Sequence, residues 1–110
     1  GDSICGWKTH FGNQATTANL GIYAHVTGKT NIAVEIDGKK YDLGRPKIGI
    51  ILGTNSQVGC NTVSDPGTFL GPYTIVYQLT RLNKGFYGPN EIIKNKPMEN
   101  NVIERSPLRK

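Results

Sequence analysis

The sequence predicts an all-β fold, a parallel β-helix built from three short sheets, and two observations support it. Glycine (14) and proline (6) supply 20 of the 110 residues, and both weaken helix interiors. Apolar residues and glycines also recur with a period of six along two stretches of the chain. In a β-helix of this kind each six-residue repeat forms one side of a coil, and three repeats complete the coil.

The longer repeat block starts at Leu52. Most of its apolar positions are followed by glycine, which permits close backbone approach at a bend. A small hydroxyl residue stands two positions before each later position of this apolar series. One position of the series, Ser64, is itself polar. The apolar positions are Leu52, Val58, Leu70 and Val76, and the hydroxyl positions are Ser56, Thr62, Thr68 and Thr74. We expect the aliphatic side chains to fill the coil interior and the repeat to fade after Val76.

A shorter block near the N-terminus has the same register. Cys5 and Phe11 take the apolar place, and Gly6 and Gly12 follow them. The competing fold is a small β-sandwich, which would alternate with a period of two and carry turn signals roughly every 8 to 12 residues. Three residue classes in one six-residue register favour the β-helix.

Residues 20–47 separate the two blocks and lack the period. Within this excursion residues 31–36 alternate between apolar and polar, Asp37-Gly38 is a two-residue hairpin signal, and residues 39–43 can return as a second strand. We therefore expect a projecting hairpin. It would either cover a neighbouring surface or edge, or close as a flap over a ligand.

The length suits one domain, with the β-helix over residues 1–89 and a C-terminal cap and polar tail over residues 90–110. The tail could hold a short helix or strand that caps the open coil, although Pro97 and Pro107 limit any such element. Beyond Pro97 the sequence predicts weak order.

Composition and charge narrow the function classes. The net charge of +5 would suit a polyanion, but no run of five basic residues exists, so we expect phosphorylated small molecules rather than nucleic acid as partners. No apolar run approaches the roughly 18 residues of a membrane span, so we expect no membrane partner and a cytoplasmic location. No metal-ligand cluster is evident, and no metal is expected. Cys5 and Cys60 lack a zinc-type spacing, and we predict buried free thiols.

Several segments resemble one enzyme family. Gly1-Asp2-Ser3 and the run His10-Phe11-Gly12-Asn13-Gln14-Ala15-Thr16-Thr17-Ala18-Asn19-Leu20 resemble the acetyltransferase domain of bifunctional UDP-N-acetylglucosamine pyrophosphorylase/glucosamine-1-phosphate N-acetyltransferases. Gly44-Arg45-Pro46-Lys47-Ile48-Gly49 is similar to the G-R-R-K-L-G of related sugar-phosphate nucleotidyltransferases that carry the same hexapeptide-repeat β-helix. The resemblance covers roughly residues 1–85 in one register.

This resemblance implies a homotrimer of left-handed β-helices that binds acetyl-CoA and an amino-sugar phosphate where subunits meet. It implies that Asn19 and His10 are catalytic, with His10 also at a substrate-contacting position. Cys60 falls beside the acetyl-CoA groove. Arg45 and Lys47 match basic positions, which we assign to the substrate phosphate and to CoA respectively.

Two function classes stay open. The first is an N-acetyltransferase domain, in which the sugar amine attacks the thioester of acetyl-CoA. The family's general-base histidine would precede Gly1, and Leu20 replaces a tyrosine after Asn19. His10 is either a site residue, which serves as a base near neutral pH or donates to a phosphate oxygen, or a surface histidine. The second class is a non-catalytic trimerisation module of a sugar-phosphate nucleotidyltransferase.

Overall fold

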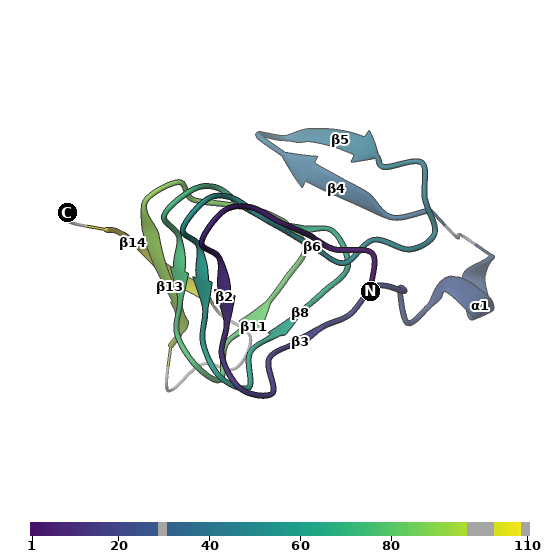
Figure 1. Ribbon diagram of the computed structural model, residues 1–110. Coiled ribbons are helices and arrows are strands. Elements are labelled where there is room, and N and C mark those ends of the chain that lie inside the picture. Colours follow the sequence, from purple (N-terminus) through teal and green to yellow (C-terminus); the bar gives the residue numbers. More distant parts are fainter. Residues whose placement is uncertain (29–30, 97–102, 109–110) are drawn as a thin grey trace.

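A computed structural model describes residues 1–28, 31–96 and 103–108. Within these residues the fold is all-β apart from one four-residue helix. The chain passes in turn through three sheets whose strands are parallel, except for the last strand of one of them (Figure 1). We call each passage a coil. The coils are β1 (Ile4–Cys5), β2 (His10–Phe11) and β3 (Thr16–Thr17); then β6 (Ile50–Leu52), β7 (Gln57–Val58) and β8 (Val63–Ser64); then β9 (Thr68–Leu70), β10 (Ile75–Val76) and β11 (Arg81–Leu82); then β12 (Gly85–Tyr87) and β13 (Glu91–Asn95).

Equivalent strands of successive coils lie side by side. The sheets run β1-β6-β9-β12, β14-β13-β10-β7-β2 and β11-β8-β3, and Leu52 stands opposite both Cys5 and Leu70. The predicted all-β class with parallel sheets is confirmed, and the arrangement is compatible with a β-helix. Its left-handedness and its assembly as a trimer stay predictions.

The interior of the coils follows the predicted register. The aliphatic side chains at the four apolar positions of the longer block are at most 3% exposed. The hydroxyl positions are buried as well, and their hydroxyls donate to backbone carbonyls: Ser56 to Gly71 at 2.8 Å, Thr68 to Asp65 at 2.7 Å and Thr74 to Gly71 at 2.9 Å. Small hydroxyl residues suit these positions because a buried polar group needs a hydrogen-bond partner.

Ser64, the polar step in the apolar series, also lies inside. It is 1% exposed, and its Oγ has no hydrogen-bond partner among the residues described. Since an unsatisfied buried hydroxyl costs about 1–3 kcal/mol, Ser64→Ala is expected to raise the free energy of unfolding by about 1 kcal/mol, measured by urea denaturation. Ser56→Ala, which removes a bonded hydroxyl, should lower it; stabilisation by both variants or neither would contradict this account.

The repeat does not fade after Val76, and that prediction was wrong. Thr80 and Leu82 continue both columns at 2% and 0% exposure, and Tyr87 and Ile93 join the core cluster. The spacing of inward residues shortens from six to five between Leu82 and Tyr87, and an aromatic ring replaces the aliphatic side chain. A strict six-residue count therefore misses the inward positions after Leu82, although the coils continue there.

The excursion contains the predicted hairpin. It holds the helix α1 (Ala24–Thr27) and the antiparallel strands β4 (Ala33–Ile36) and β5 (Lys39–Asp42), which project from the coils in Figure 1. Asp37 and Gly38 have φ of 53° and 76°, as a type I′ turn requires. Val34 is 2% exposed, and a Cβ on Gly67 would lie 2.9 Å from its Cγ1. The hairpin thus covers a corner of its own coils.

The C-terminal segment adds an antiparallel strand to the five-stranded sheet. In β14 (Ile103–Pro107), Arg105 stands opposite Ile93 of β13, so the expectation of weak order beyond Pro97 was wrong for these residues. The rest of that expectation, residues 97–102 and 109–110, lies outside the described residues. Arg105 binds Glu91 through two hydrogen bonds, Nη2 to Oε1 at 2.6 Å and Nε to Oε2 at 3.0 Å.

This ion pair predicts an acid-sensitive contact. Burial alone would raise the pKa of Glu91, but hydrogen bonds from Arg105 and from the Gly88 N–H, with the charge of Arg105, hold that pKa below its ordinary 4.5. A lowered folded-state pKa contributes stability that is present above the unfolded pKa and lost as pH falls through the folded value. Urea denaturation should therefore show stability falling as pH drops from about 5 to 3. The fall should be smaller in Glu91→Gln than in Glu104→Gln; equal slopes would contradict this assignment.

Candidate functional site

A groove of about 460 Å³ crosses the first three coils and contains two of the predicted site residues. We call it the three-coil groove. Its lining includes His10 from β2, Gln57 from β7, Ile75 from β10, and Cys60, Tyr77 and Gln78 from the turns that follow. Because β2, β7 and β10 are adjacent in one sheet, the groove runs across the strands, along the stacking direction of the coils.

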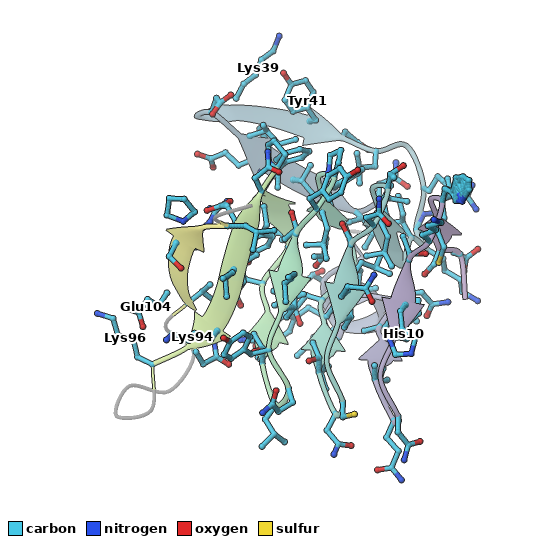
Figure 2. The ribbon with its side chains drawn as sticks, turned by 60° about the vertical axis from the view of Figure 1, so that its left-hand side comes forward. His10, Lys39, Tyr41, Lys94, Lys96 and Glu104 are labelled. Atoms are coloured by element: carbon cyan, nitrogen blue, oxygen red, sulfur yellow. The ribbon has the colours of Figure 1, made fainter. Side chains whose placement is uncertain are left out.

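The groove has an apolar floor and polar ends. Ile75 and Tyr77 contribute apolar side chains to its lining. Val58 and Val76 also line it, but their side chains point into the coils and are 3% and 2% exposed. Figure 2 shows His10 toward one side of the sheet and Lys94 toward the other. The Lys94 Nζ lies 5.9 Å from the ring centroid of Tyr77, which lines the groove. A cation is thus held near the end of the groove away from β2.

Both cysteines are free and exposed, so the predicted burial was wrong. Cys5 occupies an inward register position opposite Leu52, but β1 is the edge strand of its sheet, and within the described residues no coil covers it. Cys60 lies two positions after the inward Val58, in the turn that leaves β7. Its thiol is therefore accessible in the three-coil groove.

The other predicted residues gather where the excursion leaves and rejoins the coils. The Asn19 Nδ2 donates to Asp2 Oδ2 at 2.9 Å, and Arg45 Nη2 lies 3.5 Å from Asp2 Oδ1. The Arg45 Nε donates to the carbonyl of Lys47 at 3.2 Å, and Lys47 pairs with Leu20 in an antiparallel bridge. We call Asp2, Asn19, Arg45 and Lys47 the root cluster.

The structure therefore divides the predicted site into two parts. His10 and Cys60 share the three-coil groove, whereas Asn19, Arg45 and Lys47 belong to the root cluster. No hydrogen bond or ion pair joins the two parts among residues 1–28, 31–96 and 103–108.

Sequence reasoning gave no site role to Asp2, Gln57 or Gln78, and it predicted Tyr77 to be a packing or interface residue or an aromatic that flanks an adenine ring. Asp2 stands within the segment that carries the resemblance, but its bonds to Asn19 and Arg45 depend on the fold. A stacking of the six-residue repeats would have placed Gln57 beside His10, its partner in register. Tyr77 and Gln78 follow the inward Val76 as Cys60 follows Val58, so the same stacking would have placed them beside Cys60.

The part of the chain that the structure describes contains no group of three or more His, Cys, Asp or Glu side chains able to hold a metal ion. None of its helices is long and apolar enough to cross a membrane.

The chain is similar in sequence to a known enzyme. No protein-family model matches the chain. Over 84 residues the chain is 29% identical to a bifunctional sugar-1-phosphate nucleotidylyltransferase/acetyltransferase of Sulfurisphaera tokodaii. The match covers 76% of this chain and 20% of that protein, so the chain spans about one fifth of the length of the curated relative. The name of that relative contains a nucleotidylyltransferase and an acetyltransferase activity, and it is consistent with the resemblance found in the sequence.

Proposed function

We propose that this chain is a left-handed, trimeric hexapeptide-repeat β-helix that binds acetyl-CoA in the three-coil groove and serves N-acetyl transfer to an amino-sugar phosphate. The observation that carries the proposal is the groove itself. It crosses three coils and brings together His10 and Cys60, which the resemblance places at a substrate-contacting position and beside the acetyl-CoA groove.

The groove suits the chemistry of an acyl-CoA. The pantetheine arm is a long chain of methylenes and amides, which matches an apolar floor bordered by the amides of Gln57 and Gln78. The phosphates at the far end of CoA need a cation, and Lys94 lies beside Tyr77 at one end of the groove. The thioester would then lie toward His10.

The proposed trimer would unite the two parts of the site. A root cluster that lies apart from the groove of its own chain can complete the groove of a neighbouring subunit in a closed ring. In the transfer step the sugar amine attacks the acetyl carbon, the C–S bond to CoA breaks, and the amine proton leaves through His10. The Asn19 amide is an available donor for the oxyanion.

The two cysteines provide the experiment. Both thiols are exposed, but Cys60 alone of the two lines the groove, so Cys5 is an internal control. We expect saturating acetyl-CoA to slow alkylation of Cys60 by iodoacetamide about tenfold or more, with alkylation of Cys5 unchanged, measured by mass spectrometry of the two peptides. Equal rates at Cys60 with and without acetyl-CoA would exclude it from the groove and favour the trimerisation module.

A further inference from the structure

The outer faces of the three coil sheets differ in charge. The strands of the sheet β1-β6-β9-β12, which all lie within the described residues, contain no Asp, Glu, Lys or Arg. We call it the uncharged sheet. By contrast, β13 of the five-stranded sheet carries Glu91 and Lys94, and β11 of the three-stranded sheet carries Arg81. Charged side chains are the usual occupants of a surface that faces water, so the uncharged sheet is an exception on this molecule.

The outer face of the uncharged sheet carries an apolar row. Side chains alternate between the two faces of a strand, and the inward neighbours of the row include the buried Leu52. Ile4 and Phe86, at the two ends of the row, are 65% and 42% exposed, and the two residues between them are half-buried. The row consists of Ile4, Ile51, Phe69 and Phe86, which stand opposite one another from coil to coil. Contiguous exposed apolar side chains mark interaction surfaces, and aromatic residues are enriched in such surfaces.

The surroundings of the row are also apolar and hollowed. Trp7 and Tyr73, in the turns that follow β1 and β9, are 63% and 40% exposed. The hairpin lies on the outer side of the uncharged sheet (Figure 1), and β4 packs against β12. A cavity of about 550 Å³ remains between them, and its lining includes Ile36, Asp37 and Phe86. The hairpin tip therefore stands off from the sheet and leaves room for side chains of another chain.

A second copy of this chain is the partner that this face fits. Copies with a net charge of +5 repel each other, and a charge that is buried in an interface loses its hydration. Like-charged copies therefore approach at least cost through the sheet that has no charges. The row also repeats at the spacing of neighbouring strands, roughly 4.8 Å. Two such rows with parallel coil axes match at every coil, which an unrelated surface does not.

We propose that copies of this chain pack together through the outer face of the uncharged sheet, with the apolar row at the contact. The number of copies rests on the proposed function, whereas the contact face rests on the row and on the distribution of charge.

This contact would bring the two parts of the candidate site together. Asp2 precedes β1 and Lys47 precedes β6, so the root cluster lies where the chain enters the uncharged sheet. The turn that contains Trp7 leaves that sheet for β2, which borders the three-coil groove. In a closed ring of copies the entry edge of one sheet lies beside the exit edge of the next. The root cluster of one copy would thus lie toward the groove of its neighbour.

Sedimentation of two matched variants tests the contact face. Phe86 of the uncharged sheet and Val63 of the three-stranded sheet are 42% and 43% exposed. We expect Phe86→Asp to raise the dissociation constant of the assembly about a hundredfold or more, because a carboxylate would be buried without a partner. Val63→Asp should leave the constant unchanged. Ile4→Asp repeats the test at the more exposed end of the row, and circular dichroism checks that each variant is folded.

An assembly that resists both row variants, or that Val63→Asp dissociates instead, would overturn the proposal, as would a monomeric unaltered chain. If neither row variant folds, the fluorescence of Trp7, the one tryptophan of the chain, decides the question. Its emission should move to longer wavelength when dilution dissociates the unaltered assembly, and an unchanged spectrum would contradict this contact.

Alkylation of Cys60 separates this inference from the proposed function. Protection of Cys60 by acetyl-CoA in an assembly that resists both row variants defeats only the contact face. An assembly that depends on Phe86 and Ile4 but shows no protection defeats only the acetyl-CoA site.

Discussion

Gly59→Ala is expected to destabilise the chain by about 3 kcal/mol, at the upper end of the range for overpacked sites. A Cβ at position 59 would lie 2.5 Å from the backbone nitrogen of Gln78 and 2.8 Å from its Cα. Those atoms belong to the next coil, whose main chain cannot retreat without breaking the bond from the Gly59 N–H to the carbonyl of Val76. Urea denaturation of the purified variant measures the loss.

Gly21→Ala is the matched control. The nearest atom to a Cβ at that position is Cδ1 of Ile32 at 3.9 Å, which is an ordinary contact, so its midpoint should change little. Gly12→Ala should behave like Gly59→Ala, because its Cβ would lie 2.5 Å from the backbone nitrogen of Cys60. If Gly59→Ala unfolds at the same urea concentration as Gly21→Ala, the coils are not stacked as closely as described.

His10→Ala is expected to lower the rate of acetyl transfer to glucosamine 1-phosphate by about 10²–10⁴-fold, the usual contribution of a general base. Its effect on acetyl-CoA affinity should be small, because the floor and amides of the three-coil groove remain. Release of free CoA thiol, followed with a thiol reagent on separated product, measures the rate.

The other histidine of the chain, His25 in α1, is the control for this experiment. His25→Ala should retain the full rate. Equal rates in His10→Ala and the unaltered protein would remove His10 from the chemistry and leave it as a residue of the groove wall.

Much of the fold follows from spacing alone. The column of Leu52, Val58, Leu70 and Val76 was predictable because an interior one side chain wide accepts one aliphatic residue per repeat. The Asp37-Gly38 turn was predictable because few dipeptides accept its backbone angles. The continuation of the coils beyond Val76 was not predictable. The spacing of inward residues shortens to five before Tyr87, which breaks the six-residue count, although hydrogen bonds between the strands keep the coils in register.

The site was predictable only in part. Spacing and resemblance picked out His10 and Cys60, which share a groove, and Asn19 and Arg45, which share the Asp2 carboxylate. The exposure of Cys5 was not predictable, because Cys5 fits the inward register. It is exposed because no coil covers it within the described chain.

The most direct test of the proposed function is a calorimetric titration with acetyl-CoA, with free CoA and ATP as controls, together with sedimentation in the same buffer. The account predicts micromolar binding that favours acetyl-CoA, by a particle of three times 12.0 kDa. No heat from a folded trimer would contradict the acetyl-CoA site and leave a trimerisation module. A folded monomer that binds acetyl-CoA equally well would contradict a site completed between subunits.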